Sequence, residues 1–361
     1  MNKDAKIFVA GHNGLVGSAI LHNLQSKGYT HFVTRSSSEL DLRNQQAVSD
    51  FFSKEKPGYV FLAAAKVGGI VANITYRGEF IYDNLMIQNN VIHQAYVHGI
   101  KKLLFLGSTC IYPRDAHQPM SEQELLTGPL EYTNEPYAIA KIAGLKMCES
   151  YNLQYGTNFI AVMPTNLYGP NDNFDLHSSH VLPALIRKIY LGKCLENNDW
   201  QSIRSDLAKR PIRSINGKAS ENDILEQLQS FGISRNASQT VEVEIWGSGT
   251  PLREFLWSEE MADACVFIME KVNFSDLKGN QKDIRNCHIN IGTGEELSIK
   301  QLAEIIQKTI GFNGNLQFNT TKPDGTLRKL TDPSKLNQLG WKYSIHIDEG
   351  VKKLYEWYIA H

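Results

Sequence analysis

The residues in this sequence with the clearest chemical potential are Tyr137 and Lys141. Four positions separate them, so a helix would carry both side chains on one face. An ammonium group beside a phenol lowers the pKa of the phenol, and the phenol can then donate a proton to a carbonyl oxygen or accept one in return. The same spacing occurs by chance in ordinary helices, so the pair needs support from elsewhere in the chain.

Ser108 gives part of that support. It closely follows the apolar run 103–106, which predicts a buried strand. Ligands of α/β sheets bind at the carboxyl ends of the strands, so a serine there can hydrogen-bond a substrate carbonyl. Ser108, Tyr137 and Lys141 would then supply a polarising donor, a proton donor and a tuning cation. This set suits hydride transfer from a nicotinamide to a ketone.

A glycine-rich loop near the N-terminus predicts a bound dinucleotide. It follows the apolar run 6–10 and opens a helical pattern. Gly11 permits a tight turn, Gly14 lets the backbone approach a pyrophosphate, and Gly17 permits close packing of helix on strand. The helix N-terminus favours the anion. The other expected cofactor contacts in this loop are Asn13, Leu15 and Val16.

The end of the second expected strand, 31–34, bears on which dinucleotide is bound. Arg35 occupies the place where an acid would hold the ribose 2′-hydroxyl of NAD, and no acid occurs before Glu39. A cation there favours a 2′-phosphate, so the sequence favours NADP over NAD. Further contacts are expected beside the adenine and along the cofactor, from Asp41, Leu42, Ala63, Ala64 and Ala65.

Strand and helix patterns alternate over the first 170 residues, which we interpret as one dinucleotide-binding domain. We expect strands at 6–10, 31–34, 59–64, 102–107 and 159–163, and helices at 18–27, 47–54, 80–98 and 136–155. This alternation predicts the α/β class with a Rossmann-type, doubly wound parallel sheet.

Residues 171–361 lack that regular alternation and predict a smaller, mixed substrate-binding domain. We expect a strand at 241–245, helices at 258–271 and 298–310 that Ser258 and Ser298 cap, and a last helix at 347–359.

Residues 195–240 stand apart as an insertion. Their first half has little apolar periodicity, and their second half predicts a helix at 220–231 with Ser220 as its cap. Two interpretations stay open: a tolerated surface insertion, or a lid or partner surface near the substrate.

Composition narrows the class of protein. The 361 residues are 42% hydrophobic and 21% charged, which is typical of a globular enzyme. The net charge of −1 provides no positive electrostatic field that would attract nucleic acid or anionic membranes. The longest apolar run, 60–72, contains Lys66 and is too short for a bilayer, and the start of the chain leaves no room for a signal peptide. Five cysteines without a CxxC spacing predict reduced thiols, no metal site and a cytoplasmic location.

The loop 11–17, Ser108 and the Tyr137-x-x-x-Lys141 motif together resemble the extended short-chain dehydrogenase/reductase superfamily. A narrower resemblance is to the GDP-L-fucose synthase family, the GDP-4-keto-6-deoxymannose 3,5-epimerase/4-reductases. It covers nearly the whole chain outside the insertion and is carried by the stretches 63–70, 107–113, 134–141, 163–170, 246–251, 253–255 and 322–325.

This resemblance implies two chemistries in one pocket. The 4-keto group acidifies the hydrogens on C3 and C5, and Cys110 and His180 match the family's epimerising acid/base pair. By residue type alone, Cys110 is a buried packing residue and His180 a polar residue at a helix start. The resemblance implies further cofactor contacts from Leu106, Gly107, Lys141, Pro164, Asn166, Leu167 and His180. It implies contacts to the GDP-sugar from Asn166, Lys188, Trp246, Arg253 and Asp324.

The sequence also departs from the family pattern. Asn13 and Ser37 stand where members often carry basic residues, which weakens the expected grip on a 2′-phosphate. The insertion falls among presumed substrate contacts and leaves an alternative open: a C4 reductase of a GDP-4-keto heptose with little or no epimerase activity.

A third possibility is a dinucleotide-sensing protein without catalysis, which the intact Ser108, Tyr137 and Lys141 disfavour. By analogy with related enzymes, helices 80–98 and 136–155 would pair in a homodimer.

Overall fold

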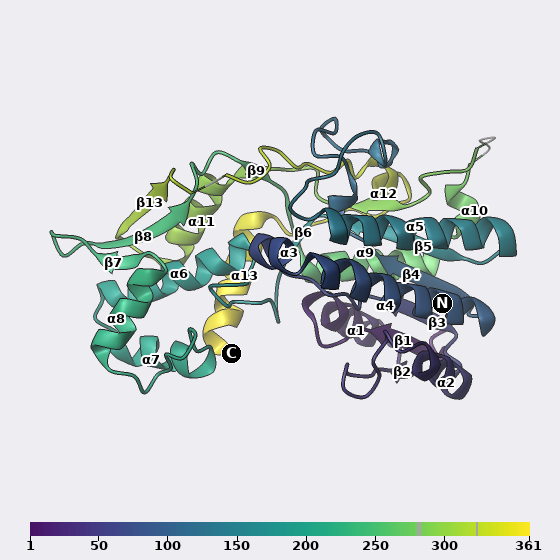
Figure 1. The fold of residues 1–361 in the computed structure, drawn as a ribbon, viewed down its shortest axis with the longest axis horizontal. Coiled ribbons are helices and arrows are strands. Elements are labelled where there is room, and N and C mark those ends of the chain that lie inside the picture. Colours follow the sequence, from purple (N-terminus) through teal and green to yellow (C-terminus); the bar gives the residue numbers. More distant parts are fainter. Residues whose placement is uncertain (280–282, 323) are drawn as a thin grey trace. The chain divides into compact units, whose positions relative to one another are not determined.

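The computed structural model describes residues 1–279, 283–322 and 324–361 (Figure 1). The chain forms two compact units. Unit 1 consists of residues 1–171, 254–295 and 329–345, and unit 2 of residues 172–253, 296–328 and 346–361. The chain first passes from unit 1 to unit 2 after residue 171, next to the expected boundary at residue 170. Two later segments, 254–295 and 329–345, return to unit 1. A single cut therefore does not describe the chain.

Unit 1 is built on a six-stranded, wholly parallel sheet, which confirms the predicted α/β, doubly wound fold. Its strands, in spatial order, are β2 (Phe32–Val33), β1 (Ile7–Ala10), β3 (Tyr59–Leu62), β4 (Lys102–Leu106), β5 (Phe159–Pro164) and β11 (Ile289–Ile291). The chain leaves β1 toward β2 and then returns to the other side of β1 with β3. The carboxyl ends of β1 and β3 therefore form the crevice where such sheets bind ligands.

Helices cover both faces of this sheet. Ile7 and Val9 of β1 pack in one core cluster with α1 and α9, while Phe8 and Ala10 pack in the other with α2, α4 and α5. Figure 1 shows α4 and α5 running side by side. The helices of unit 1 are α1 (Leu15–Ser26), α2 (Gln45–Glu55), α3 (Ile70–Thr75), α4 (Arg77–Val97), α5 (Glu135–Tyr155), α9 (Ser258–Lys271), α10 (Phe274–Leu277) and α12 (Ser334–Gln338), with short 3-10 turns at Thr109–Ile111 and Glu122–Glu124. A parallel pair, β6 (Asn166–Tyr168) and β10 (Phe255–Trp257), completes the unit.

The two expected serine caps have different outcomes. Ser298 forms a capping box with Gln301 at the start of α11 (Ile299–Ile310), as predicted. The prediction for Ser258 is wrong, because Ser258 is the first residue of α9 and Trp257 is its N-cap. The side chain of Ser258 lies against Gly169, where a Cβ atom would come within 2.0 Å of its hydroxyl. Packing decides the orientation of this serine.

Unit 2 has a three-stranded sheet in the order β13 (Asn315–Asn319), β8 (Val241–Trp246), β7 (Ile233–Arg235). A second pair joins β9 (Leu252–Arg253) to β12 (Leu297–Ser298). Its helices are α6 (Val181–Glu196), α7 (Trp200–Lys209), α8 (Glu221–Ser230), α11 and α13 (Ile347–Ala360).

The insertion is an integral part of unit 2. Ser220 caps α8 by accepting the Asp223 N–H at 3.2 Å, as predicted. The insertion also supplies α7 and the edge strand β7, neither of which the sequence predicted. Its apolar side chains are at most 2% exposed at Leu195, Ile203, Leu207, Ile212, Ile224, Leu228 and Ile233. The insertion is therefore a packed part of unit 2, and both interpretations of its role stay predictions.

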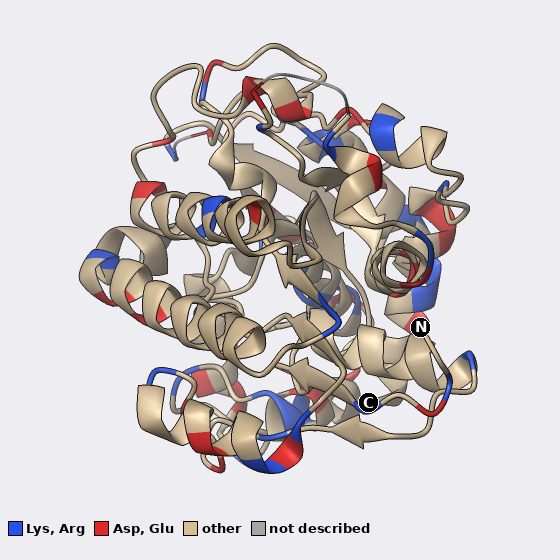
Figure 2. Cartoon of the chain, turned by 90° about the vertical axis from the view of Figure 1, so that its right-hand side faces the viewer, with Lys and Arg blue, Asp and Glu red and all other residues tan. Residues whose placement is uncertain are grey.

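Acidic and basic residues are interspersed along the described chain (Figure 2). None of the described helices is long and apolar enough to cross a membrane.

Candidate active site

The glycine-rich loop of unit 1 has the geometry of a dinucleotide cradle. Gly11 adopts a φ of +87°, and a Cβ there would lie 2.7 Å from the Ala64 nitrogen. A Cβ at Gly17 would lie 2.1 Å from the Gly11 carbonyl oxygen, so both positions require glycine. Gly14 is the N-cap residue of α1 and has no side chain that could cap the helix. The first-turn N–H groups, beginning at Leu15, are therefore available to a pyrophosphate, and the residues present fit the expected cofactor.

The alanine stretch that follows β3 lies at the same edge of the sheet as the glycine loop. The Ala63 N–H donates to the Ala10 carbonyl at the end of β1, at 3.0 Å. Ala64 approaches Gly11 closely, as described above. Ala63, Ala64 and Ala65 are thus placed to line a dinucleotide that binds along the loop.

Arg35 lies just beyond β2, at the expected place for a 2′-phosphate, but its charge is partly paired. Its guanidinium donates to the Thr34 carbonyl and to the Glu55 carboxylate, each at 2.7 Å. Glu39 folds back onto Ser36 and accepts from its N–H and its hydroxyl, each at 2.7 Å. Arg35 therefore supplies a positive charge at this position, but the Glu39 carboxylate lies only four residues further along the chain.

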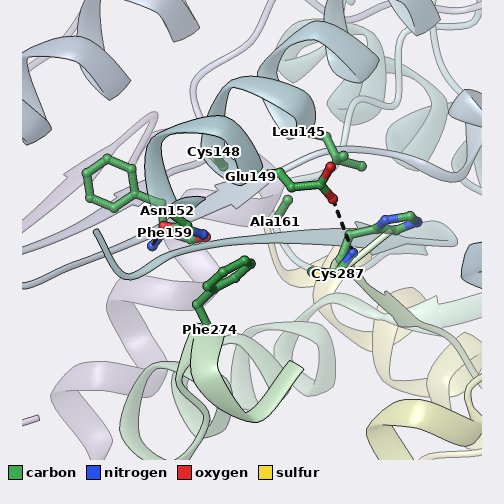
Figure 3. Close-up of a pocket in the computed structure, with 9 residues that line it drawn as sticks. Leu145, Cys148, Glu149, Asn152, Phe159, Ala161, Phe274 and Cys287 are labelled. Atoms are coloured by element: carbon green, nitrogen blue, oxygen red, sulfur yellow. Dashed lines mark hydrogen bonds between the residues drawn. The ribbon is translucent and has the colours of Figure 1, made fainter. Parts of the chain in front are cut away.

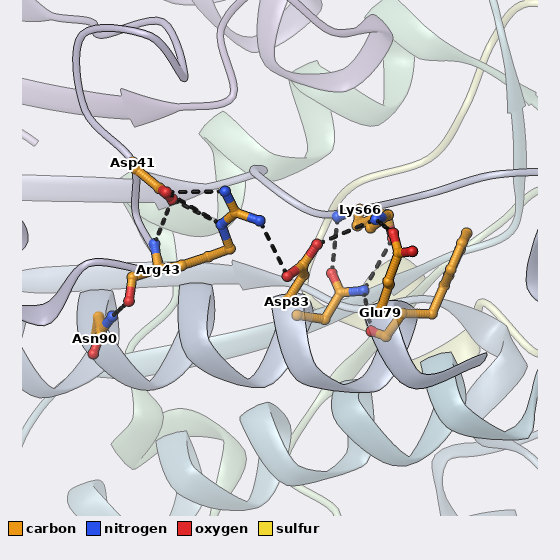
Figure 4. A network of polar contacts seen from close by, with 8 residues as sticks. Asp41, Arg43, Lys66, Glu79, Asp83 and Asn90 are labelled. Carbon is orange, nitrogen blue, oxygen red and sulfur yellow. Dashed lines mark hydrogen bonds and ion pairs between the residues drawn. The ribbon is translucent and has the colours of Figure 1, made fainter. Parts of the chain in front are cut away.

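A polar network that the sequence did not single out connects this edge to α4 (Figure 4). Asp41 accepts from Arg43, with both Nε and Nη2 at 2.9 Å, and these bonds lower the pKa of Asp41. Arg43 continues to Asp83 at 3.3 Å, and Asp83 also accepts from the Lys66 ammonium at 3.2 Å. The network joins the loop expected beside the adenine to the loop after β3.

Two amide side chains of α4 hold the backbone of these loops. The Asn84 side chain accepts from the Lys66 N–H and donates to the Lys66 carbonyl, both at 3.0 Å. The Asn90 amide donates to the Leu42 carbonyl at 2.9 Å. Both walls of the expected adenosine site are therefore fixed by α4 before any ligand binds.

The structure brings the expected reductive residues together at the carboxyl end of β4. The Lys141 ammonium is nearly buried, donates to the Leu106 carbonyl at 2.8 Å and lies 5.6 Å from the centroid of the Tyr137 ring. Ser108 follows β4 and accepts from the Cys110 N–H at 3.3 Å. Next to it, a Cβ at Gly107 would lie 2.3 Å from the Met163 sulfur, so a larger residue there would require the Met163 side chain to move.

One expectation about this group needs correction, namely that Lys141 lowers the pKa of Tyr137. Burial raises the pKa of the Tyr137 phenol above its usual value, and burial lowers the pKa of Lys141 to about 8. Desolvation dominates because the Lys141 ammonium is directed at the Leu106 carbonyl. Tyr137 is consequently protonated at neutral pH, as a proton donor must be.

Cys110 lies beside this group and is 5% exposed. Burial raises the pKa of its thiol, although Lys329, Ser108 and Lys141 oppose the shift. The thiol is therefore protonated at neutral pH and suited to donate a proton.

Three further expected cofactor contacts, Pro164, Asn166 and Leu167, lie where β5 ends and β6 begins. The Asn166 amide donates to the Glu254 carbonyl at 2.9 Å.

In unit 2, Arg253 and Asp324 lie in one polar group with Ser248, which the sequence did not single out. Asp324 accepts from the Ser248 N–H at 2.9 Å and from its hydroxyl at 2.8 Å. Burial lowers the pKa of Arg253, and the charge of Asp324 opposes that shift. Gly247 is required here, since a Cβ at its φ of +84° would lie 2.2 Å from an Asp324 oxygen. Pro323, from the same motif, lies outside the described residues.

Two further expected contacts to the GDP-sugar lie at β8: Lys188 reaches it from α6, and Trp246 is its last residue. The Lys188 ammonium donates to the Glu244 carbonyl, and burial lowers its pKa to about 8. Trp246, at the end of β8, is 61% exposed, and the Lys322 ammonium lies 5.3 Å from its ring centroid. An exposed indole at a strand end offers a stacking surface.

His180 is the N-cap residue of α6, and its side chain makes no capping bond. Desolvation lowers the pKa of its imidazole, which leaves the ring neutral at neutral pH and able to accept a proton. Cys110 belongs to unit 1 and His180 to unit 2, so their joint action stays a prediction.

Comparisons with known proteins show the family to which the chain belongs. Residues 7–210 and 222–292 match the NAD dependent epimerase/dehydratase family. The chain is 50% identical to a putative GDP-L-fucose synthase 2 from Arabidopsis thaliana, over 99% of this chain and 93% of the relative. It is 46% identical to the solved structure of a GDP-6-OMe-4-keto-L-xylo-heptose reductase from C. jejuni, which covers 99% of this chain and 98% of that one with a TM-score of 0.91.

A third relative has a cofactor in place. MlghC, a GDP-mannoheptose C4 reductase from Campylobacter jejuni with NADP bound, is 45% identical over 99% of both chains with a TM-score of 0.86. Together with the glycine loop and the Ser108, Tyr137 and Lys141 group, these similarities show that the chain belongs to the NAD dependent epimerase/dehydratase family, within the extended short-chain dehydrogenase/reductases.

Proposed function

We propose that this enzyme catalyses NADPH-dependent 3,5-epimerisation and C4 reduction of a GDP-4-keto-6-deoxy sugar, as in GDP-L-fucose synthesis. The observation that carries this proposal is the arrangement at the end of β4. There Lys141, tethered to Leu106, lies beside a protonated Tyr137, with Ser108 and Cys110 joined by a hydrogen bond. One cluster thus offers Ser108 as a hydrogen-bond donor to the substrate carbonyl, Tyr137 as a proton donor and the Cys110 thiol as a separate acid.

The reduction uses the residues of unit 1. The glycine loop would hold NADPH, which when bound would supply the hydride to C4. Ser108 and Tyr137 orient and polarise the 4-keto oxygen, and Tyr137 delivers the proton that the new alkoxide requires. Lys141 stabilises the phenolate that Tyr137 leaves behind, because an opposite charge nearby favours the ionised form.

The epimerisation uses Cys110 and His180. A carbonyl at C4 acidifies the C–H bonds on C3 and C5, so one group removes a proton and another returns it to the opposite face. A neutral imidazole and a neutral thiol are suited to these two roles. Lys188, Arg253, Trp246 and Asp324 would hold the GDP portion, the two cations at the phosphates and the indole as a stacking surface.

The test is one reaction in D2O with NADPH and GDP-4-keto-6-deoxymannose, followed by NMR of the product. Deuterium at both C3 and C5 together with NADPH consumption supports the proposal. NADPH consumption without deuterium at those carbons supports a reductase alone. Absence of both, with a folded protein that binds NADPH, contradicts the proposal.

A C4 reductase of a GDP-4-keto heptose is the second candidate. The GDP-heptose reductases among the similar solved structures favour it. So does the insertion, which folds into unit 2 between Lys188 and Trp246 in the sequence. Comparing kcat/KM for GDP-4-keto heptose and GDP-4-keto-6-deoxymannose decides between the candidates, since the true substrate should be favoured at least about tenfold, or 1.4 kcal/mol.

We propose NADP rather than NAD as the cofactor, with Arg35 at the 2′-phosphate. Replacing Arg35 with alanine should lower kcat/KM for NADPH about 10- to 100-fold, the value of one charge-assisted contact. The value for NADH should change little. Arg114→Ala is the matched control, because that exposed arginine pairs only with its neighbour Asp115 among the described contacts. Equal losses with NADPH and NADH in Arg35→Ala would contradict the assignment.

The reduction should depend on the protonation of Lys141. Because its pKa is lowered to about 8, Lys141 is charged below that pH and neutral above it. We expect kcat for reduction under saturating substrate, where Lys188 is held at the phosphates, to decline with an apparent pKa near 8 as the pH rises, measured by NADPH absorbance. In Lys141→Arg the decline should disappear at a lower overall rate, since a guanidinium stays charged.

Loss of folding would not explain such a decline. Lys141 and the buried Lys102 both have a pKa lowered from 10.5 to about 8. Between about pH 8 and pH 10.5 the folded chain binds fewer protons at these two lysines than the unfolded chain does. The contribution of the two lysines to the free energy of unfolding therefore rises with pH. Circular dichroism over the same pH range checks this. A flat profile for the wild type would contradict the role of Lys141.

We also propose a cytoplasmic homodimer. Exposed apolar side chains lie on α4 and α5, among them Tyr82 at 61%, Val97 at 54%, Leu153 at 50% and Ile139 at 42%. A monomer mass by light scattering at micromolar concentration would contradict the dimer. All five cysteines are unpaired, which fits a reducing compartment, and cell fractionation tests the location.

A further inference from the structure

A buried ion pair joins the insertion to the helix that His180 begins. Arg187 of α6 is 0% exposed and Asp206 of α7 is 4% exposed. The Arg187 Nε and Nη2 atoms donate to one Asp206 oxygen at 3.0 Å and 2.9 Å. The other oxygen accepts from the Tyr358 hydroxyl and faces Arg210 at 3.6 Å. Every oxygen of this carboxylate has a partner, so its position is closely determined.

Arg187 also holds the segment that leads to His180. Its Nη1 donates to the Phe174 carbonyl at 3.1 Å. From there to the helix the segment is fixed by Asp175, which accepts from the Ser178 N–H at 2.9 Å and its hydroxyl at 2.8 Å. A contact at Phe174 is thus transmitted through one compact turn to His180, the N-cap of α6.

The Phe174 side chain packs on Tyr358 at a ring-centroid distance of 4.7 Å, and a cavity of about 300 Å³ adjoins the same segment. The residues around the cavity are Asp172, Asn173, Phe174, Asp175, Arg187, Arg210, Pro211 and Trp357. Beside such a space, directional polar contacts add to this packing in holding the backbone. The bond from Arg187 to Phe174 is one of them, and Asp206 orients the guanidinium that makes it.

We propose that Asp206, supplied by the insertion, is a positioning residue for His180 and acts through Arg187 and the segment 174–180. This inference rests on the proposed role of His180 in proton exchange at C3 and C5. It gives the insertion a function within unit 2: it completes the support of a catalytic side chain. Removing the charge of Asp206 would leave a buried guanidinium without its counter-ion, and Arg187 would then reorient and release Phe174.

The test compares Asp206→Asn with a matched variant of the same helix, Arg204→Gln. Arg204 donates to the Gly217 and Ala219 carbonyls at 2.9 Å and 2.7 Å, entirely within the insertion. In Asp206→Asn we expect deuterium incorporation at C3 and C5 to fall about 10- to 100-fold, as for a catalytic group displaced by about 1 Å. Reduction of a 4-keto sugar that needs no epimerisation should change less than about threefold. Arg204→Gln should keep both rates, and equal losses in the two variants would overturn the proposal.

An apolar double variant, Arg187→Met with Asp206→Leu, separates positioning from stability. Exchanging a buried ion pair for apolar residues of similar volume often preserves or raises stability. We expect a folded protein in which exchange at C3 and C5 stays low, because the contact to Phe174 is absent. A double variant that folds and exchanges at the wild-type rate would overturn the proposal.

The imidazole of His180 gives a readout that does not depend on the reaction. Its proton NMR signals, assigned by their loss in His180→Gln, should shift in Asp206→Asn and not in Arg204→Gln. Unchanged signals in Asp206→Asn would overturn the positioning role. A wild-type protein without exchange at C3 and C5 would instead contradict the proposed function, so the two failures are distinguishable.

Discussion

Replacing Tyr137 with phenylalanine should lower kcat for C4 reduction about 10²- to 10⁴-fold, the usual contribution of a general acid. The phenol lies beside the buried Lys141 at the end of β4, and burial keeps it protonated. Phenylalanine preserves the ring, which packs edge-on against Phe80 at a centroid distance of 6.5 Å, and removes only the hydroxyl. The measurement is NADPH oxidation under saturating substrate.

Binding and folding should be unaffected in this variant. The dissociation constant for NADPH, measured by fluorescence, should stay within about twofold of the wild type, since the expected pyrophosphate and 2′-phosphate contacts lie at the glycine loop and Arg35. Tyr151→Phe is a suitable control, because it removes a hydroxyl from the same helix, where it contacts His93 at 2.9 Å. A kcat for Tyr137→Phe within about threefold of the wild type would remove Tyr137 from the proton transfer.

The sequence predicted the sheet of unit 1 because its signals are local. Apolar runs such as 103–106 form buried strands, and glycines mark the turns where a Cβ would clash, as at Gly11 and Gly17. The carboxyl ends of parallel strands meet at one edge. The position of Ser108 after an expected strand therefore predicted that it lies at the ligand-binding edge of the sheet.

The parts that the sequence missed depend on contacts between distant segments. Helix α7 buries only Ile203 and Leu207 as apolar side chains, and its third buried position is the charged Asp206. Asp206 is buried because Arg187, 19 positions earlier, neutralises it. The link from Asp41 through Arg43 to Asp83 likewise joins residues far apart in the chain. Ser248 had a signal, its place in the stretch 246–251, but its partner Asp324 is 76 positions away.

The pKa of Tyr137 shows a limit of motif reasoning. The spacing of Tyr137 and Lys141 correctly places both on α5, but spacing carries no information about burial. In the folded protein, desolvation is the largest cause of both pKa shifts, raising the pKa of Tyr137 and lowering that of Lys141. The motif therefore identifies the participants of a proton transfer, and the fold determines their protonation states.

A control for Cys110 comes from another buried thiol in unit 1. Cys148 of α5 is 1% exposed and lines a cavity of about 10 Å³ together with Glu149, Asn152 and Cys287 (Figure 3). Like Cys110, it has a pKa raised by burial. It has no proposed part in the reaction, so Cys148→Ala reports only the cost of removing a buried sulfur.

Replacing Cys110 with alanine should abolish deuterium incorporation at C3 and C5 and leave C4 reduction nearly intact. The thiol is the proton donor proposed for epimerisation, and its loss should lower exchange about 10²-fold or more. Lys141 keeps its bond to the Leu106 carbonyl, and Ser108 keeps the bond from the backbone N–H of residue 110 while it loses its contact with the thiol. A 4-keto sugar that needs no epimerisation should therefore be reduced within about threefold of the wild-type rate, as in Cys148→Ala. If Cys110→Ala loses both reactions while Cys148→Ala keeps both, Cys110 also acts in the reduction, and the separation of the two chemistries proposed above is wrong.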